Sequence, residues 1–429
     1  MQSTIQWFKE FTPATLAVAC LLACSAPDLT GRPSGEQWVA TWAASTTASP
    51  GNAPVFNNQT LREIVHTSVG GNRVRVRLSN YFGLQPLVIG AVHIAIRGSG
   101  SAILPGSDRA LTFDGRSSAS VPPGAPLLSD PVPLTVPSLR DIAVSIYLPG
   151  ATPAATTHWG AQQTSYVSRG NTTSSATLQA TSAITFWPFL SSVDVTGPET
   201  NEAVVTLGDS ITDGAESTRD ANRRWPDILA ARLLAKDPLR PIAVVNAGIG
   251  GNRVLHDGAG SSGPTFGPSA LARFDRDVLV QAGVKYVIVL EGINDIGHPG
   301  IAAPISEDVS TEEIIAGLRQ LIERAREKGL RIFGGTILPF EGTTSPGYYT
   351  PERERKRQEV NLWIRSSKVF DAVIDFDNAL RDPNHPARLL RSYDSGDHLH
   401  PSDAGYQRMG DAVNLSLFSS NTSTLRATH

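Results

Sequence analysis

A serine, an aspartate and a histidine stand where they could do nucleophilic chemistry together. Ser210 comes just after the apolar run Ala203–Leu207, and far along the chain Asp397 and His400 lie three residues apart. A serine hydroxyl is a weak nucleophile until an adjacent base takes its proton, and a histidine oriented by a carboxylate can be that base. The pattern therefore predicts Ser210 as a nucleophile, His400 as its base and Asp397 as the group that orients the imidazole.

Alternative roles fit these residues less well. A serine after a strand often caps a helix instead. The nucleophile elbow G-x-S-x-G does not fit, because Thr212 occupies the place of its last glycine. His398 and His400 with a carboxylate could bind zinc, but the sequence offers no third ligand block at a matching spacing. We therefore expect neither a metal nor an organic cofactor.

Four separated blocks widen this pattern. They are Gly-Asp-Ser at Gly208–Ser210, Asn-x-Gly-x-x-Gly at Asn246–Gly251, Gly-x-Asn-Asp at Gly292–Asp295 and Asp-x-x-His-Pro at Asp397–Pro401. Three of them follow apolar, strand-like runs. In this order they make the chain resemble a secreted hydrolase of the SGNH/GDSL type over about residues 200–418. The Asp-x-x-His spacing of that family selects His400 rather than His398 as the base.

The resemblance also implies an oxyanion hole. Preorganised hydrogen-bond donors aimed at a developing oxyanion usually supply the largest single catalytic contribution. In this family the donors are the serine N–H, a glycine N–H from the second block and the asparagine side chain from the third, which match Ser210, Gly251 and Asn294. Gly250 is the alternative register for the glycine. The neighbouring Asp209, Asp213 and Asp295 are expected to hold loop and cap backbone groups rather than to take part in catalysis.

The kind of secondary structure that the sequence predicts changes near residue 200. Before it, short strand-like runs are separated by prolines and glycines, and residues 37–198 show no long helical periodicity. This indicates a β-sandwich of jelly-roll type. Within it, Leu61–Val69 and the alternating Asn72–Ser79 are joined by Gly70-Gly71, which predicts a hairpin.

After residue 200, strands and helices alternate. Helical spacing over Trp225–Leu234 and Thr311–Lys328, with a capping box at Ser310–Glu313, separates apolar strands, and 404–417 fits a closing helix. Such alternation predicts a parallel sheet with helices on both faces and a ligand crevice at the carboxyl ends of the strands. The resemblance implies the same architecture, a flavodoxin-like, three-layer α/β/α domain.

Length and charge restrict the class of protein. The chain has 429 residues, 40% hydrophobic and 18% charged, as expected for a folded protein of two domains. A net charge of -3 gives no basic surface for nucleic acid, so we expect no such partner. We expect a β-sandwich accessory domain over 37–198, a hydrolase domain over 199–418 and a polar tail over 419–429. Oligomeric state is left open.

The first residues are expected to be a targeting segment rather than part of the fold. Residues 1–24 contain an apolar run too short to span a bilayer, which ends in Leu21–Cys24 and resembles a bacterial lipobox. Cys24 would then be lipidated, residues 25–36 would form a tether, and the protein would be exported as an outer-membrane or cell-surface lipoprotein. An ordinary signal peptide cut near Ala26, giving a periplasmic or secreted protein, is the alternative. Cys20 and Cys24 are the only cysteines in the sequence, so no disulfide is expected in the fold.

Taken together, these features predict a carboxylic ester hydrolase that works through an acyl-Ser210 intermediate. Short-chain esters, such as acetyl esters of small molecules or polysaccharides, are the expected substrates. A broad aryl or lipid esterase is the alternative enzyme, and a catalytically silent glycan-binding lipoprotein is the alternative of another class. Aromatic residues that could line a substrate pocket, but more often belong to a core, are Trp187, Trp225, Phe266 and Tyr406.

Overall fold

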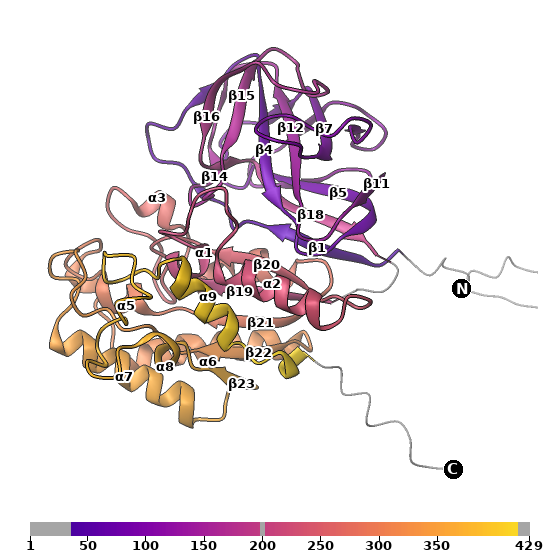
Figure 1. The fold of residues 1–429 in the computed structure, drawn as a ribbon. Coiled ribbons are helices and arrows are strands. Elements are labelled where there is room, and N and C mark those ends of the chain that lie inside the picture. Colours follow the sequence, from indigo (N-terminus) through magenta and orange to yellow (C-terminus); the bar gives the residue numbers. More distant parts are fainter. Residues whose placement is uncertain (1–35, 198–201, 419–429) are drawn as a thin grey trace, which may run out of the picture. The chain divides into compact units, whose positions relative to one another are not determined.

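The computed structural model describes residues 36–197 and 202–418. The predicted signal segment with Cys24, nearly all of the tether, the domain boundary at 198/199 and the polar tail lie outside the described residues. Figure 1 shows that the part before residue 198 consists of strands, whereas strands and helices alternate after residue 202.

Two antiparallel sheets enclose the core of the first part. Alternate residues of a strand face this core, so Val74 and Val76 are fully buried whereas Arg73 and Arg75 are partly exposed. The β-sandwich prediction is confirmed. One sheet contains β1 (Trp38–Ala43), β18 (Leu190–Thr196), β5 (Gly71–Ser79), β10 (Pro126–Leu128) and β11 (Val132–Val136), and the other contains β16 (Ala180–Ile184), β15 (Ser165–Arg169), β4 (Gln59–His66), β12 (Asp141–Leu148), β7 (Ala91–Ile96) and β8 (Arg109–Leu111).

The expected hairpin through Gly70-Gly71 is wrong. β4 pairs with β12 and β15 in one sheet, and β5 pairs with β18, β10 and β11 in the other, so the chain crosses between sheets at this point. The glycines serve close approach rather than a tight turn. A Cβ at Gly70 would lie 2.4 Å from the carbonyl oxygen of Val136, and one at Gly71 would lie 2.4 Å from that of Thr196.

Small sheets complete the sandwich. The one that matters for the site contains β2 (Thr47–Ala48), β14 (Thr156–His158) and β17 (Trp187–Pro188). The others are β3 (Val55–Phe56) with β13 (Thr152–Pro153), and β6 (Leu87–Ile89) with β9 (Ala119–Val121).

A five-stranded parallel sheet forms the centre of the second part. Its order is β20 (Ala243–Gly248), β19 (Ala203–Gly208), β21 (Val284–Leu290), β22 (Arg331–Gly335) and β23 (Ala372–Ile374). This is the flavodoxin-like 2-1-3-4-5 order, with its switch point beside the first strand. The strands are apolar at nearly every position because both faces of the sheet are covered. The predicted α/β class is confirmed.

Helices pack in two groups around this sheet. One group is α2 (Trp225–Lys236), α8 (Phe376–Leu380) and α9 (Asp403–Ala412), and the other is α4 (Ala270–Phe274), α6 (Thr311–Glu327) and α7 (Pro351–Ser366). Short helices α1 (Ser210–Asp213), α3 (Gly263–Phe266) and α5 (Ile293–Gly297) lie in the loops beyond the strands. None of the helices in residues 36–197 and 202–418 has the length and apolarity needed to cross a membrane.

The predicted capping box at the start of α6 is present, whereas the predicted closing helix is interrupted. Ser310 and Glu313 form the predicted capping box of α6, with the Glu313 carboxylate 2.7 Å from the Ser310 N–H. The closing segment is not one helix. α9 ends at Ala412, and a separate 3-10 turn covers Leu415–Phe418.

The sandwich is joined to the α/β part through buried contacts. The Ala40 N–H of β1 donates to the Ala282 carbonyl at 2.9 Å, and the Val244 N–H of β20 donates to the Ser68 hydroxyl at 3.1 Å. Ala203, at the start of β19, packs in the apolar core of the sandwich. The first strands of the α/β sheet are therefore built directly against the sandwich.

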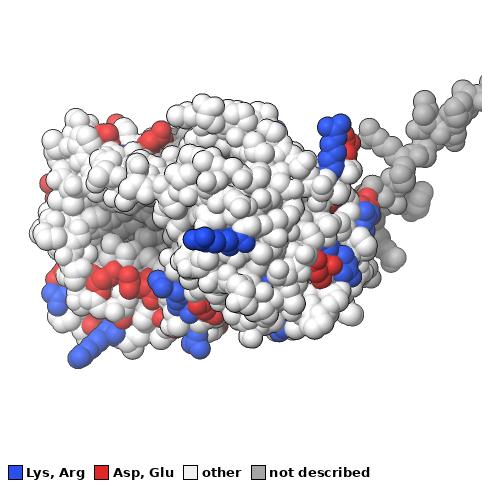
Figure 2. Space-filling model, turned by 90° about the horizontal axis from the view of Figure 1, so that it is seen from above, with Lys and Arg blue, Asp and Glu red and all other residues white. Residues whose placement is uncertain are grey.

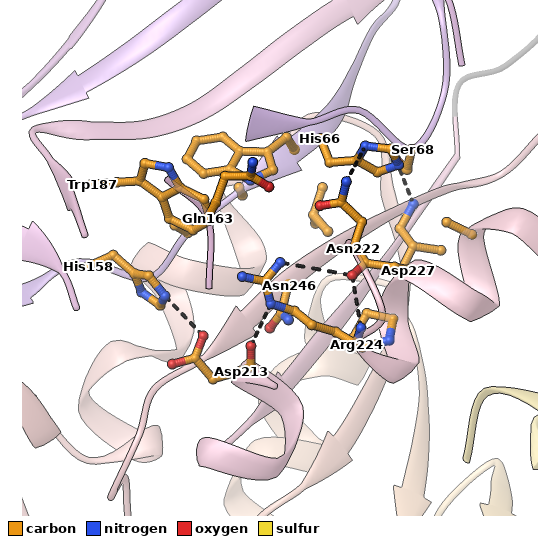
Figure 3. Close-up of a pocket in the computed structure, with 17 residues that line it drawn as sticks. His66, Ser68, His158, Gln163, Trp187, Asp213, Asn222, Arg224, Asp227 and Asn246 are labelled. Atoms are coloured by element: carbon orange, nitrogen blue, oxygen red, sulfur yellow. Dashed lines mark hydrogen bonds and ion pairs between the residues drawn. The ribbon is translucent and has the colours of Figure 1, made fainter. Parts of the chain in front are cut away.

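A buried ion pair also joins the two parts. Figure 3 shows the His158 ring pointing toward Asp213, next to a cavity of about 30 Å³. His158 Nε2 lies 2.9 Å from the Asp213 carboxylate, and Nδ1 donates to the Ser45 carbonyl at 2.8 Å. Burial lowers the pKa of His158, but the Asp213 charge and both hydrogen bonds outweigh burial, so the pKa is raised. We infer an imidazolium ion that donates from both nitrogens.

Replacing His158 with Ala should destabilise the protein by about 3–5 kcal/mol, because it leaves the Asp213 carboxylate buried and unpaired. Since the folded pKa of His158 is raised, its stabilisation is fully present below about pH 6.5 and is lost as pH rises through the folded pKa. Urea unfolding at several pH values measures the difference. The exposed pair Arg240–Asp237 supplies a control, since Arg240→Ala should cost under about 1 kcal/mol. Equal losses in the two variants would show that the buried pair does not stabilise the fold.

Candidate active site

The sheet order brings three of the predicted site residues to one edge. Ser210 follows β19, Gly251 follows β20 and Asn294 follows β21. β19 lies between β20 and β21, and all three strands run parallel, so their carboxyl ends are neighbours. The three loops therefore meet at the switch point, where ligands of such sheets bind.

The structure also brings Asp397 and His400 to Ser210. The Ser210 Oγ lies 2.8 Å from His400 Nε2, and His400 Nδ1 lies 2.5 Å from the Asp397 carboxylate. Because Nδ1 faces a carboxylate, it carries the proton and leaves Nε2 free to accept the serine proton. The three side chains can therefore pass a proton from Ser210 to His400 while Asp397 stays ionised.

Hydrogen bonds keep Asp397 in this role. Its Oδ1 accepts from the backbone N–H groups of Leu399 at 2.9 Å and His400 at 2.8 Å, and from the Ser395 hydroxyl at 3.0 Å. Burial raises the pKa of the carboxyl group, but the hydrogen bond and charge of His400 and the backbone donors outweigh it. The pKa of Asp397 is held well below its ordinary value, so the group is a carboxylate at any working pH.

His398 points elsewhere. Its side chain is 48% exposed and is paired with Asp394 rather than with Ser210. The backbone of His398 has a φ of 60°, in the left-handed region, and this residue lies between the motif residues Asp397 and His400. Within residues 36–197 and 202–418, no cluster of three or more histidine, cysteine or carboxylate side chains could hold a metal ion.

The Asn294 side chain has a fixed orientation. Its Oδ1 accepts from the Tyr348 hydroxyl at 2.7 Å, and its Nδ2 donates to the Asn252 carbonyl at 2.8 Å. These partners determine which end of the amide is the donor and leave one N–H of Nδ2 free. Asn294 lines the cavity beside Ser210, so this N–H is available to a ligand.

Backbone donors lie around the same cavity. The N–H groups of Ser210, Gly250 and Gly251 have no protein acceptor in the part of the chain that the structure describes. Gly251 has a φ of 75°, and a Cβ there would lie 2.2 Å from the Phe266 ring, so only glycine fits without a shift. Both glycine registers therefore remain compatible with an anion site beside Ser210.

Arg273 holds the strand ends in place. Its buried guanidinium donates to the carbonyls of Gly208 at 2.9 Å and Ala247 at 2.7 Å, near the ends of β19 and β20, and to Asn252 Oδ1 at 2.8 Å. It also pairs with Asp277 and Glu291. One side chain thus connects the loops that carry Ser210, Gly251 and the acceptor of the Asn294 amide.

Buried carboxyl groups support the same loops. Asp209 Oδ1 accepts from the Ile211 N–H at 2.9 Å and caps α1, and Asp295 accepts from the Val254 and Leu255 N–H groups. Burial raises the pKa of Asp209 to about 7 and that of Asp295 to about 6, because the backbone donors only partly offset the loss of water. Their geometry agrees with the cap and loop roles expected from the sequence.

A cavity of about 500 Å³ opens above Ser210 and His400. The sandwich supplies one of its walls, a feature that the sequence did not indicate. Figure 2 shows a hollow on a face with few charged side chains, beside a strip of acidic residues. The sandwich residues that line the cavity are Thr47, His158, Trp159, Gly160 and Gln162, and the α/β part adds, among others, Ile249, Phe266, His298, Tyr348 and Leu399.

The four aromatic candidates lie in different places. Phe266 lines the cavity, whereas Trp225 and Tyr406 are fully buried in the α/β core, and Trp187 is buried in the sandwich core. No local pattern marks the lining residues Trp159, His298 and Tyr348, because each is an isolated residue that only the tertiary fold brings to the site.

Replacing Asp209 with Asn should stabilise the protein at alkaline pH. An acid whose pKa is about 3.9 in the unfolded chain and about 7 in the fold binds more protons when folded, so stability falls as pH rises between these values. Asparagine caps a helix equally well and carries no charge. The expected gain is about 1–3 kcal/mol at pH 8 and close to zero at pH 4, measured by thermal unfolding. The exposed Asp114→Asn serves as the control, and a gain that does not change with pH would contradict this interpretation.

Comparison with known proteins agrees with the geometry. Residues 206–408 match the model of the GDSL-like Lipase/Acylhydrolase family. No curated protein matches the chain.

Several solved structures resemble about half of the chain. LAE5, an alpha/beta hydrolase enzyme from the metagenome of Lake Arreo, is 24% identical over 50% of this chain and 94% of its own, with a TM-score of 0.37. A variant of Axe2, an acetyl xylan esterase from Geobacillus stearothermophilus, is 22% identical over 50% and 93%, with a TM-score of 0.37. The aryl esterase of M. smegmatis is 17% identical over 49% and 95%, with a TM-score of 0.38.

The family match spans the segment from β19 to α9 and includes all four sequence blocks. Residues 206–408 therefore form a domain of the GDSL-like lipase/acylhydrolase family, and the chain is a serine hydrolase.

Proposed function

We propose that this protein hydrolyses carboxylic esters by acyl transfer, with Ser210 as nucleophile, His400 as general base and acid, and Asp397 as the group that orients the imidazole. The observation that carries the proposal is the continuous hydrogen-bonded path, 2.8 Å from Ser210 to His400 and 2.5 Å from His400 to Asp397. It lies at the cavity, where a substrate can reach the serine.

The reaction follows from these positions. His400 takes the proton of Ser210 as its Oγ attacks the ester carbonyl, and the imidazolium that forms is stabilised by Asp397. The same proton then goes to the leaving alkoxide, which gives the alcohol and an acyl-Ser210 ester. A water molecule repeats the sequence on the acyl-enzyme, with His400 again as base, and releases the acid.

The free donors suit the oxyanion of both tetrahedral intermediates. We assign this role to the N–H groups of Ser210 and Gly251 and to the free N–H of Asn294 Nδ2, with Gly250 as the alternative glycine. Donors that are already fixed cost no reorganisation when charge develops. Support comes from the partners of Asn294, since Tyr348 and Asn252 hold its amide before any substrate arrives.

Short-chain acyl esters of carbohydrates are the proposed substrates. The polar side chains of His298 and Gln162 in the cavity wall, which have no partner within the described residues, support a hydroxylated substrate. A broad aryl or lipid esterase is the second candidate, because Ile249, Phe266 and Leu399 give the same cavity much apolar surface. Rates on acetate esters of rising alcohol polarity, compared with esters of rising acyl length, distinguish the two.

Export and membrane attachment stay proposals based on the sequence alone. The lipobox-like Leu21–Cys24 supports a lipid anchor on Cys24, and a plain signal peptide is the alternative. A silent glycan-binding role is not proposed, because the chain is a serine hydrolase with the three side chains in contact.

Replacing Ser210 with Ala should lower kcat by about 10⁵–10⁶ without unfolding the protein, since the change removes one oxygen and the nucleophile. His400→Ala should cost nearly as much, and Asp397→Ala less, because the imidazole can still act without its carboxylate. Hydrolysis of p-nitrophenyl acetate measures these rates. His398→Ala is the matched control and should retain most activity. More than about a tenth of the activity in Ser210→Ala would overturn the assignment.

Replacing Asn294 with Ala should lower kcat by about 10²–10³, the usual effect of removing one oxyanion donor, with a smaller change in KM. Tyr348→Phe should have a milder effect of the same kind, because it frees the amide to rotate. Steady-state kinetics separate the two parameters. A raised KM with an unchanged kcat would make Asn294 a ground-state binding residue instead.

A further inference from the structure

His298 is a buried polar side chain to which the proposed reaction assigns no role. It follows α5, is 6% exposed and lines the cavity above Ser210. Its ring stacks on Phe266, with centroids 5.1 Å apart, and meets the edge of Tyr348 at 5.9 Å. These two contacts fix the plane of the imidazole.

The ring nitrogens of His298 have no hydrogen-bond partner among residues 36–197 and 202–418. Both nitrogens are accessible from the cavity rather than sealed in the core, so each is free to bond a group that enters the cavity. Burial, together with the positive charges of Arg253 and Arg353, lowers the pKa of His298 to about 4. At neutral pH the ring therefore offers one donor and one acceptor, as a hydroxyl group does.

The sandwich adds an aromatic surface and an amide to this cavity. The indole of Trp159 stacks on Phe186, with centroids 4.4 Å apart, and Trp159 itself lines the cavity. Gln162 also lines it, and its side-chain amide has no partner in the described chain. Aromatic faces and neutral hydrogen-bonding groups recognise hydroxylated rings, which have apolar ring faces and polar edges.

The loop that carries these residues is held firmly to the hydrolase domain. The Gln162 carbonyl accepts from the Asp220 N–H at 3.0 Å, and Thr164 Oγ1 donates to the Asp220 carboxylate at 2.7 Å. At the other end of the loop, His158 is paired with Asp213. The wall is thus positioned before a substrate binds, which lowers the entropic cost of binding.

We infer that Trp159, Gln162 and His298 form a subsite for the hydroxylated ring of a saccharide ester, so that the β-sandwich takes part in substrate selection. The inference rests on the proposed esterase function. His158 and Asp213, the charged residues on this wall, neutralise each other, which suits an uncharged sugar. An alkyl or cycloalkyl ester would leave the His298 and Gln162 groups unpaired, and a site built to hydrogen-bond a hydroxyl discriminates strongly against such a substrate.

Three acetate esters test this inference in the full chain. Monoacetylated methyl β-xylopyranoside has a ring with hydroxyls, cyclohexyl acetate has a ring without them, and ethyl acetate has neither. The wild-type kcat/KM should be highest for the xyloside ester. His298→Phe keeps the ring stack and removes both nitrogens, so it should lower kcat/KM for the xyloside ester by about 10- to 100-fold. Its kcat/KM for the other two should stay within about threefold. His385→Phe, an exposed histidine outside the cavity, is the control and should change none of the three.

Trp159→Ala tests the contribution of the sandwich. It should lower kcat/KM for the xyloside ester about tenfold or more, through loss of the aromatic stacking surface, and leave ethyl acetate nearly unchanged. An equal loss on all three esters in either variant would mean a structural role and overturn the inference. Equal wild-type rates on the xyloside and cyclohexyl esters would also overturn it. Absence of hydrolysis of all three esters would instead overturn the proposed function on which the inference rests.

Discussion

The hydrogen bond between Ser210 Oγ and His400 Nε2 is the contact that the other interactions of the hydrolase domain hold in place. It is 2.8 Å long and joins residues from the two ends of the hydrolase domain. The serine is fixed by β19 and by the Asp209 cap of α1. The histidine is fixed by the turn before α9. Two further contacts connect these segments, since the Thr218 hydroxyl donates to Asp403 at 2.6 Å and the Tyr406 hydroxyl donates to the Ala215 carbonyl at 2.6 Å.

The carboxyl groups around this hydrogen bond are buried at a cost in folding free energy. Asp209, Glu291 and Asp295 are all buried, and burial raises the pKa of each. Arg273 offsets part of the cost by pairing with Glu291 and by binding the carbonyls near the ends of β19 and β20. Burial of carboxyl groups is unfavourable for stability, but here it fixes backbone groups around Ser210, as is common at functional sites. The sandwich is built into the same arrangement, since its His158 pairs with Asp213, and Trp159 and Gln162 line the cavity.

Local signals in the sequence predict much of this fold and part of the site. Apolar strands such as β19 and β21 are easy to predict because both faces are buried. The order of the motifs, each after a strand, predicts that Ser210, Gly251 and Asn294 lie near one another. The prediction is wrong at Gly70-Gly71, where the chain crosses from one sheet to the other and the glycines allow close contact with β11 and β18, the neighbours of β5. Arg273, Trp159 and His298 could not be predicted, since an isolated arginine, tryptophan or histidine has no local pattern that separates a site residue from a core residue.

Covalent labelling of the native protein with a fluorophosphonate, followed by mass spectrometry of the intact chain and of its peptides, would test the proposed nucleophile. An activated serine attacks such a reagent, whereas an ordinary serine does not. We predict one adduct per chain, located on Ser210, with complete loss of ester hydrolysis and no adduct in His400→Ala. An enzyme that hydrolyses esters but carries its adduct on another residue, or that remains active when Ser210 is fully labelled, would contradict the proposed triad.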